Sequence, residues 1–385
     1  MKEIRVGIIG TGIIGGHHAQ AYKNETPGVK IVAACDILED KLTAFCDKFD
    51  IENRYADFRE LLKRDDLDAV DVCVHNNLHM PIAVRILEAG FHCYCEKPLA
   101  GSYADAKIMI DRAEECGKKL HMQVATLFSP QARAAKKFID DGRLGKIYHA
   151  RSYGYRRRGR PFVDGYAEKE FDSKYWAAGG ALYDMGVYHI SLMQYLLGVP
   201  KVLRVSGQVY QELAMDEKRR AESGFDVEEL GCGFVKFEND LTMDILESWA
   251  IHAGEFPPSM IAGSEGGLSI WPTGGGDGSA LKYYNEISGY PVTTNIDLEA
   301  EEYRRSMLDP SHIHYRNSQT VWVAAMRGQC PWPETTRVAL NTTLISEGIF
   351  MSGRLGREVT RDEIVSGSRS LSLTKQETPF GVIEY

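Results

Sequence analysis

Short apolar runs alternate with amphipathic segments along the first 125 residues of the chain. Two of the amphipathic segments end at Gly90 and Gly117, as helices often do. Strands that alternate with helices in this way are typical of a doubly wound parallel sheet. A helix is expected directly after the first strand. The further predicted elements are strands at 4–9, 29–35, 69–74, 92–95 and 120–125 and helices at 39–49, 57–63, 80–89 and 104–116.

The pattern changes beyond residue 127, where most apolar runs alternate residue by residue and short turns separate them. This pattern predicts an α+β region with a mostly antiparallel sheet. The 385 residues suffice for two domains of about 100–200 residues each, so we predict domains at 1–127 and 128–385. The second contains predicted helices at 130–141, 179–197, 310–328 and 336–353 and predicted strands at 146–155, 202–212, 229–238, 241–250, 259–264 and 267–271.

Composition narrows the class of protein. The formal net charge of −9 argues against a nucleic-acid partner, because non-specific binding to nucleic acid needs a basic surface. No apolar stretch approaches the roughly 20 residues of a membrane span, and the N-terminus enters the first strand without room for a signal peptide. The eight cysteines form no C-x-x-C pair. We therefore expect a cytoplasmic protein with no membrane partner and no metal site.

The first strand runs directly into the glycine-rich turn Gly10-Thr11-Gly12-Ile13-Ile14-Gly15, and Asp36 ends the second strand. This order predicts a dinucleotide site. Gly10 allows the tight turn, Gly12 lets the backbone approach a pyrophosphate, and Gly15 lets the helix pack on the strand. The helix N-terminus offers free N–H groups to the phosphates. Asp36 would accept hydrogen bonds from the ribose hydroxyls and repel a 2′-phosphate, which favours NAD over NADP.

Polar residues follow the next two strands, at the edge where ligands of a doubly wound sheet bind. Asn76 could hold the ribose or the pyrophosphate, and His79 either packs near the nicotinamide ribose or caps the following helix. Glu96 and Lys97, which we also expect to bind the cofactor, precede Pro98, and this proline restricts Lys97 to an extended conformation. In a dehydrogenase, an ammonium at this edge favours the alkoxide of a substrate hydroxyl. The alternative is a Glu96–Lys97 pair on a surface turn.

These motifs resemble those of the Gfo/Idh/MocA oxidoreductases over nearly the whole chain. The resemblance implies an N-terminal Rossmann domain and a C-terminal domain with an open, mainly antiparallel sheet. That sheet often forms the subunit interface, so a homo-oligomer, either a dimer or a tetramer, is implied. The family's usual work is NAD(P)-linked redox chemistry at a ring hydroxyl of a sugar, inositol or polyol. The motifs are Gly10-x-Gly12-x-x-Gly15, Asp36, Asn76 with His79, Glu96-Lys97-Pro98, and Gly179 to His189.

The resemblance also implies catalytic roles. Lys97 matches the family's catalytic lysine and Asp184 its helix aspartate, and many members carry a general-base histidine four residues later. Here that position is Tyr188, as in glucose-fructose oxidoreductase and dihydrodiol dehydrogenase, and His189 follows. Positions i and i+4 share a helix face whereas i+5 points away, so Tyr188 fits the catalytic position. A phenol has a pKa of about 10, so it needs a nearby cation such as Lys97. His189 is the alternative base or a core histidine.

An aromatic and basic cluster is the candidate substrate subsite. Aromatic rings stack on the apolar faces of sugars, and arginines bind hydroxyls or carboxylates. The alternative is a solvated basic loop. The residues that we assign to substrate, besides Lys97, Asp184 and Tyr188, are Tyr155, Arg156, Arg158 and Trp176.

Three functions are consistent with the sequence. The first is an NAD-dependent dehydrogenase that moves hydride between a ring secondary hydroxyl of a sugar, glycoside or polyol and nicotinamide. The second is a redox-assisted glycoside hydrolase or lyase that retains its NAD, as some relatives do. The third is a non-catalytic NAD(P)-binding regulator, against which Lys97 and Asp184 argue.

Overall fold

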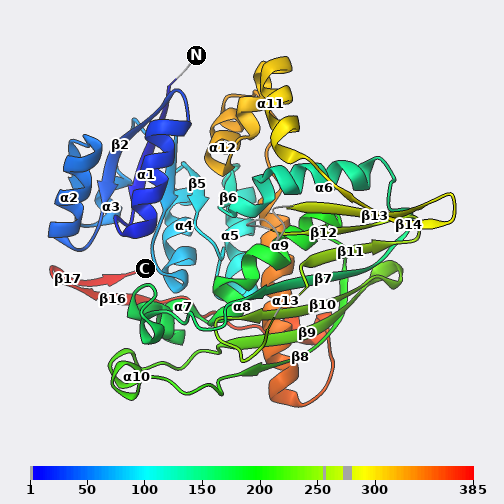
Figure 1. Ribbon diagram of the computed structural model, residues 1–385. Helices are drawn as coiled ribbons and strands as arrows, with labels where there is room; N and C mark the ends of the chain where they lie inside the picture. The colour runs from blue at the N-terminus through cyan, green and yellow to red at the C-terminus, as the bar shows by residue number, and fades with distance from the viewer. Residues whose placement is uncertain (1–2, 255–256, 272–279) are drawn as a thin grey trace. The chain divides into compact units, whose positions relative to one another are not determined.

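The computed structural model describes residues 3–254, 257–271 and 280–385. The chain forms two compact units (Figure 1). The first comprises Met1–Gln123, His314–Thr336 and Arg369–Tyr385, and the second comprises Val124–Ile313 and Arg337–Ser368. Within the described ranges, no helix is both long and apolar enough to cross a membrane.

The first unit is built on a six-stranded sheet in the order β3-β2-β1-β4-β5-β6, and all its paired strands run parallel. The strand order reverses between β1 and β4, which is where doubly wound sheets bind their ligands. The predicted fold of this region is therefore confirmed. Its strands are β1 (Ile4–Ile9), β2 (Val29–Cys35), β3 (Asn53–Tyr55), β4 (Ala69–Val72), β5 (His92–Cys95) and β6 (Leu120–Met122).

Helices pack on this sheet, and one of them comes from much later in the chain. Trp322 and Val323 of that late helix are buried in the same core as Val6 and Tyr94. The hydroxyl of Ser318 also lies 2.8 Å from the Tyr94 hydroxyl. The helices of this unit are α1 (Ile13–Glu25), α2 (Glu39–Phe49), α3 (Phe58–Leu61), the 3-10 turn η1 (Asn76–Leu78), α4 (His79–Glu88), α5 (Tyr103–Glu115) and α12 (Ser318–Met326).

The C-terminal segment also packs on the first unit. The backbone N–H of Leu371 donates to the carboxylate of Asp105, and that of Leu373 donates to the carbonyl of Asn77, both at 2.9 Å. The segment ends in a hairpin of β16 (Lys375–Thr378) and β17 (Gly381–Glu384). The sequence did not predict this hairpin. Each compact unit thus combines separate stretches of the chain, whereas the predicted domains are the continuous segments 1–127 and 128–385. A functional boundary after residue 127 stays a prediction.

The second unit contains a nine-stranded sheet in the order β14-β13-β12-β11-β7-β10-β9-β8-β15. Its β10–β7 pair is parallel and its other pairs are antiparallel, as the prediction of a mainly antiparallel sheet requires. β13 and β14 were not predicted. The strands are β7 (Ile147–Tyr155), β8 (Val202–Tyr210), β9 (Leu230–Phe237), β10 (Thr242–Ser248), β11 (Ser259–Gly263), β12 (Gly267–Ile270), β13 (Leu281–Ile287), β14 (Tyr290–Asn295) and β15 (Val359–Thr360).

The helix predicted at 179–197 is two helices that meet at Met185, and the one predicted at 310–328 is a 3-10 turn followed by α12. The helices are α6 (Pro130–Asp140), α7 (Lys174–Ala177), α8 (Ala181–Asp184), α9 (Gly186–Leu196), α10 (Glu217–Ser223), α11 (Leu298–Leu308), α13 (Thr335–Leu355) and α14 (Arg361–Gly367), with 3-10 turns η2 (Ala125–Phe128), η3 (Phe162–Asp164), η4 (Lys169–Asp172), η5 (Glu238–Asp240) and η6 (Pro310–Tyr315).

Candidate functional site

The glycine-rich turn joins β1 to α1 in the first unit. Gly10 has a φ of 97°, and a side chain there would overlap the carbonyl oxygen of Cys73. A side chain at Gly15 would overlap the carbonyl of Gly10, whereas at Gly12 nothing lies within 4 Å. The first and third glycines are therefore required by the turn, and the second leaves open space in which a ligand can approach the backbone.

Asp36 lies beside this turn at the end of β2. One of its carboxylate oxygens accepts hydrogen bonds from the backbone N–H and the hydroxyl of Thr11, both at 2.8 Å, and the other accepts from the backbone N–H of Leu38 at 2.9 Å. A carboxylate has about four acceptor positions, so capacity remains for a ribose hydroxyl. Ile13 is 66% exposed at the start of α1, an apolar surface that a bound ligand would cover. These residues fit a dinucleotide.

The loops after β4 and β5 carry the other residues predicted to bind cofactor. Asn76 and Glu96 are buried, and Lys97 is half-buried. The ring of His79 is also buried, with its nitrogens 2.8 Å from the carbonyl oxygen of Pro98 and 3.0 Å from that of Val74. His79 therefore joins the two loops through their backbones. A direct role for it in cofactor binding stays a prediction.

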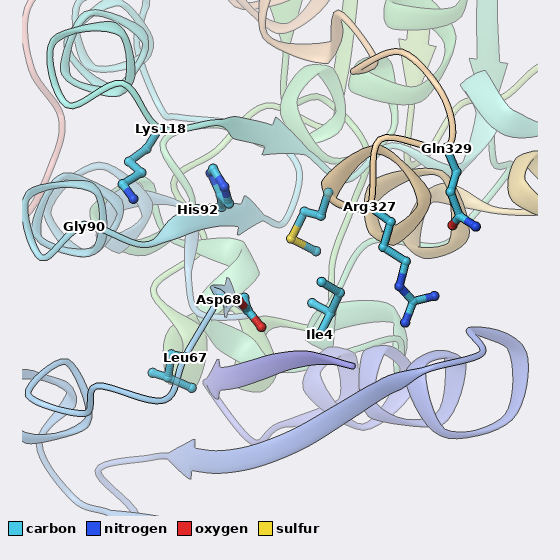
Figure 2. A pocket seen from close by; sticks show the side chains of 9 residues that line it. Ile4, Leu67, Asp68, Gly90, His92, Lys118, Arg327 and Gln329 are labelled. Atoms are coloured by element: carbon cyan, nitrogen blue, oxygen red, sulfur yellow. The ribbon is translucent and has the colours of Figure 1, made fainter. Parts of the chain in front are cut away.

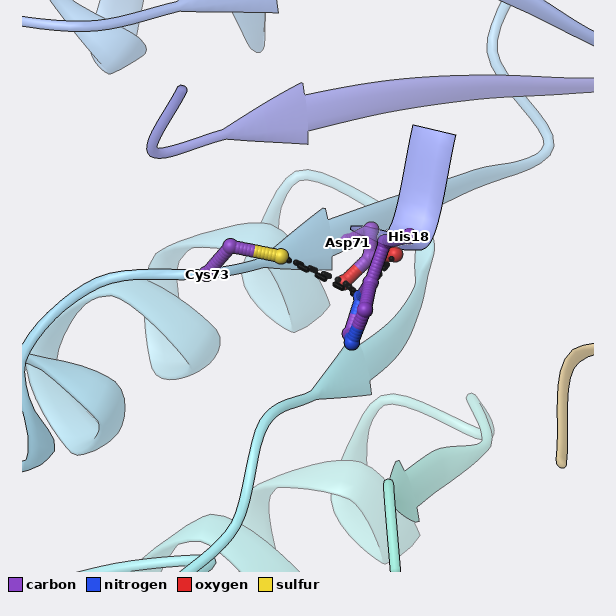
Figure 3. A group of neighbouring side chains, drawn as sticks. All are labelled: His18, Asp71 and Cys73. Atoms are coloured by element: carbon purple, nitrogen blue, oxygen red, sulfur yellow. Dashed lines mark hydrogen bonds and ion pairs between the residues drawn. The ribbon is translucent and has the colours of Figure 1, made fainter. Parts of the chain in front are cut away.

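A buried charged cluster lies behind these loops, and the sequence analysis missed it (Figure 3). His18 of α1 places Nδ1 2.9 Å from an oxygen of Asp71 and Nε2 2.9 Å from Oε1 of Glu96. The Cys73 thiol lies 3.4 Å from the other oxygen of Asp71. The signal for the cluster was a polar residue, Asp71, inside the apolar strand β4.

The charges in this cluster support one another. Burial by itself lowers the pKa of His18, but the charge of Asp71 and its hydrogen bond raise that pKa well above its usual range. Burial raises the pKa of Glu96, yet the hydrogen bond and charge of His18 leave it lowered overall. The second Glu96 oxygen accepts the backbone N–H of Lys97 at 2.7 Å. The cluster therefore reaches the backbone of the predicted catalytic lysine.

A pocket of about 490 Å³ lies elsewhere in the first unit (Figure 2). Ile4 begins β1 and His92 begins β5, so the pocket lies at the amino ends of the parallel strands. Dinucleotides bind at the carboxyl ends. None of the residues predicted for the site lines this pocket, so we do not assign the cofactor to it.

In the second unit, a buried carboxylate fixes the start of α8. The Glu228 oxygens accept the backbone N–H groups of Gly180 at 2.7 Å and of Leu182 at 2.9 Å. Burial raises the pKa of Glu228 to about 7, although these two hydrogen bonds lower it. The Gly-Gly segment of the sequence motif is thus pinned by an acid from far along the chain, which the sequence analysis did not identify.

Strand β10 and the residue that follows it hold two of the predicted catalytic side chains. The indole N–H of Trp249 donates to an Asp184 oxygen at 2.9 Å. Nδ1 of His189 lies 2.9 Å from an oxygen of Glu247, which is fully buried. Burial by itself lowers the pKa of His189, but the charge of Glu247 and the hydrogen bond raise it overall, and burial raises the pKa of Glu247. His189 is therefore directed to the sheet.

Tyr188 is half-buried at the first turn of α9. Its backbone N–H donates to the carbonyl of Met185 at 3.0 Å, and its carbonyl accepts from the hydroxyl of Thr126 at 3.1 Å. The backbone stays helical through Met185, with φ −93° and ψ −44°. Tyr188 therefore follows Asp184 by about one helical turn, as the sequence spacing requires.

The predicted substrate subsite is only partly assembled. Arg156 lies over the ring of Tyr166, 4.4 Å from its centroid, and is half-buried, as are Tyr155 and Trp176. The Arg158 side chain is 71% exposed and pairs with Asp164. Arg160 is almost fully buried and pairs with Asp164 and Glu229, which makes it a structural residue. The substrate roles of Tyr155, Arg156, Arg158 and Trp176 stay predictions.

The first unit has the fold and the glycine turn of a dinucleotide-binding oxidoreductase, and family models match both parts of the chain. Residues 4–124 match the "Oxidoreductase family, NAD-binding Rossmann fold", and residues 132–269 match the "GFO/IDH/MocA C-terminal domain". The chain belongs to the Gfo/Idh/MocA oxidoreductase family.

Individual relatives agree with this assignment. The chain is 27% identical over 279 residues to D-glucoside 3-dehydrogenase of Escherichia coli (strain K12), covering 70% of this chain and 78% of that protein. It is 33% identical over 155 residues to inositol 2-dehydrogenase of Salmonella paratyphi B, covering 39% of this chain and 46% of that protein. Its fold matches that of levoglucosan dehydrogenase in complex with NADH and L-sorbose, at a TM-score of 0.76 and 19% identity, covering 94% and 99% of the two chains.

Proposed function

We propose that this protein is an NAD-dependent dehydrogenase that oxidises a ring secondary hydroxyl of a sugar, glycoside or polyol. One observation carries the proposal. Lys97 follows the carboxyl end of β5, and doubly wound sheets bind dinucleotides at this edge. Its backbone N–H donates to the buried Glu96 at 2.7 Å, which supports a fixed position for this lysine. The names of the relatives, a glucoside and an inositol dehydrogenase, support the substrate class.

Each predicted catalytic residue has a role that its surroundings allow. Lys97 favours the alkoxide of the substrate hydroxyl by charge. Tyr188, with Asp184 one turn before it, takes the hydroxyl proton. Because His189 is bonded to Glu247 on the sheet, we assign it to the support of α9 rather than to this proton. When bound, NAD accepts the hydride, and Asp36 with the Gly10–Gly15 turn holds it.

The choice of NAD over NADP rests on Asp36. Its carboxylate already accepts three hydrogen bonds near the turn, and its negative charge would repel a 2′-phosphate. Titration of the protein with NADH and with NADPH, followed by nicotinamide fluorescence, measures this preference. We expect NADH to bind at least about tenfold more tightly, a difference of roughly 1.4 kcal/mol.

A homo-oligomer through the open sheet face is also proposed. Helices cover one face of the nine-stranded sheet, whereas Phe234 on the other face is 38% exposed and Leu246 and Met260 are half-buried there. Exposed apolar side chains on a sheet face are typical of an interface. Light scattering of the purified protein tests the oligomer.

The free thiols of the eight cysteines, all within the described ranges, support a reducing cytoplasmic location.

The central experiment is a single-turnover assay of nicotinamide reduction across a panel of sugars, glycosides and polyols. Lys97→Ala should lower the hydride-transfer rate on the best substrate by about 100-fold or more, because it removes a charge that stabilises the alkoxide. Lys63→Ala, at an exposed lysine of the same unit paired with Glu60, is the matched control. Near-wild-type rates for Lys97→Ala would refute the assignment. Release of an aglycone without accumulation of NADH would instead favour redox-assisted cleavage.

A further inference from the structure

The imidazole of His18 is shared by two buried carboxylates. Nδ1 lies 2.9 Å from Asp71 and Nε2 lies 2.9 Å from Glu96, and all three side chains are at least 95% buried from solvent. Each contact needs one proton between nitrogen and oxygen. A neutral imidazole carries only one N–H, and an ionised carboxylate carries none. The geometry therefore requires two protons on these three groups. Because the pKa of His18 is raised and that of Glu96 is lowered, both protons lie on the ring, which is an imidazolium between two carboxylates.

The same atoms could be considered as a metal site, since His18, Asp71 and Cys73 offer ligand atoms within 4.8 Å of one another. The hydrogen bonds argue against this. A histidine binds a metal through a nitrogen lone pair, and both nitrogens of His18 are already directed at carboxylate oxygens. A proton-bridged ion pair accounts for every polar atom of the ring.

The other groups around the His18 ring do not oppose its positive charge. Tyr94 of β5 meets the ring edge-on, with centroids 5.6 Å apart, and Tyr22 of α1 packs against Tyr94. Cys73 approaches Nδ1 with its sulfur at 3.2 Å. Among the residues that the structure describes, the titratable groups in contact with the His18 ring are therefore two carboxylates, one phenol and a thiol, and none of them is a cation. All of them favour the charged ring or are neutral.

Glu96 connects this charge to the candidate active site. Its Oε1 is held by His18 and its Oε2 accepts the backbone N–H of Lys97. The carboxylate therefore spans from α1 to the residue that carries the reacting ammonium. A carboxylate fixed at both oxygens has little freedom to rotate, and a peptide N–H bonded to it is held in direction as well as position.

We propose that His18 is a positioning residue, an imidazolium that fixes Glu96 between itself and the backbone of Lys97 and so orients the Lys97 ammonium for catalysis. The proposal rests on the proposed function of Lys97. A misplacement of about 1 Å at a reacting group costs roughly 100-fold in rate, which is the scale of effect that such support can have.

Two substitutions of His18 separate positioning from packing. His18→Asn keeps an amide N–H near the place of Nδ1, toward Asp71, and loses the donor to Glu96. His18→Gln keeps a donor near the place of Nε2, toward Glu96, and loses the one to Asp71. Both remove one buried hydrogen bond and the positive charge of the ring, so both should lower the melting temperature by similar amounts. We expect kcat of His18→Asn to fall on the order of tenfold to 100-fold further than that of His18→Gln.

The affinity for NADH, measured on the same samples by nicotinamide fluorescence, should stay similar in the two variants. Equal kcat values for the two variants, or kcat values that follow only their melting temperatures, would overturn the positioning role. If wild-type protein oxidises no compound of the panel, the proposed function fails instead, and this comparison is then replaced by a direct measurement of protonation.

That measurement is ¹⁵N NMR of the wild-type protein with labelled histidine, in which His18 is identified by the signals that vanish in His18→Gln. We expect both ring nitrogens of His18 to carry protons throughout the range from about pH 6 to pH 8. An unprotonated ring nitrogen at neutral pH would overturn the imidazolium, whatever the enzyme's activity. This readout needs neither cofactor nor substrate.

Discussion

Two histidines that bond to buried carboxylates, one in each unit, show how the number of carboxylates around an imidazole sets what it can do. His18 donates to Asp71 and Glu96, one at each ring nitrogen. His189 bonds to Glu247 through Nδ1, and no second hydrogen bond of its ring occurs within the part of the chain that the structure describes. The first ring must keep both protons to satisfy its partners. The second can lose one and keep its hydrogen bond, so it remains titratable.

The largest expected effect tests whether that titratable histidine is nevertheless only a support. Tyr188→Phe removes the phenol that we assign to proton transfer, so kcat on the best substrate should fall by about 10²- to 10⁴-fold. His189→Asn keeps a donor toward Glu247 and should lower kcat by less than about tenfold. Steady-state kinetics on both variants measures the difference. The reverse order of effects would make His189 the general base and Tyr188 a supporting residue.

The next effect tests whether His18 is charged. Asp71→Ala leaves the His18–Glu96 pair without its second carboxylate and removes a buried hydrogen bond from the imidazolium. We expect the free energy of unfolding to drop by about 3–5 kcal/mol, as for other buried pairs that lose one partner. Urea denaturation measures it. Glu60→Ala, which breaks an exposed pair with Lys63, should cost at most about 1 kcal/mol, and a similar cost at Asp71 would contradict a charged His18.

A further carboxylate, that of Asp172, extends the comparison to an acid without a histidine partner. Asp172 is fully buried, and its pKa is raised to about 7, chiefly by burial. Because the folded pKa exceeds the unfolded one, ionisation costs stability that is intact in acid and is lost as the pH rises toward 7. Asp172→Asn should therefore gain on the order of 1–3 kcal/mol at pH 8 and almost nothing near pH 4. Thermal unfolding at the two pH values measures this gain, and equal gains at both would contradict it.

Local patterns predicted most of the elements, because strands and helices of the first 125 residues follow from periodicity and glycine stops. The helix of residues 39–49 begins and ends where the sequence placed it. The glycine turn and Asp36 were found for the same reason, since their signal lies within one short segment. Residues 314–336 and 369–385 belong by contacts to the first unit, and the sequence did not indicate this, because nothing in their own periodicity says which sheet they pack on.

The supporting residues of the site escaped sequence analysis for a related reason. Glu228, Glu247 and Trp249 contact the segment of α8 and α9 from positions in or next to β9 and β10, 46 to 65 residues later. His18 meets Glu96 across 78 positions. A single sequence shows each of them only as an acid, an indole or an imidazole in an apolar segment. To identify their partners, one must know the register of β10 and the orientation of α1, and both are determined by tertiary packing.

The smallest expected effect is the pH dependence of the stability that the His189–Glu247 pair contributes. Glu247 raises the pKa of His189 overall, so the charged ring adds stability that is present below the unfolded pKa of about 6.5 and is lost as the pH rises through the raised folded value. Glu247→Gln removes that charge while it keeps an acceptor for Nδ1–H. The variant should therefore be less stable than wild type by about 1–2 kcal/mol near pH 5.5, and the gap should narrow toward pH 9. Unfolding midpoints over that range measure the gap. A gap that stays constant would mean that His189 does not change its charge, so that it resembles His18 and the two histidines differ only in place.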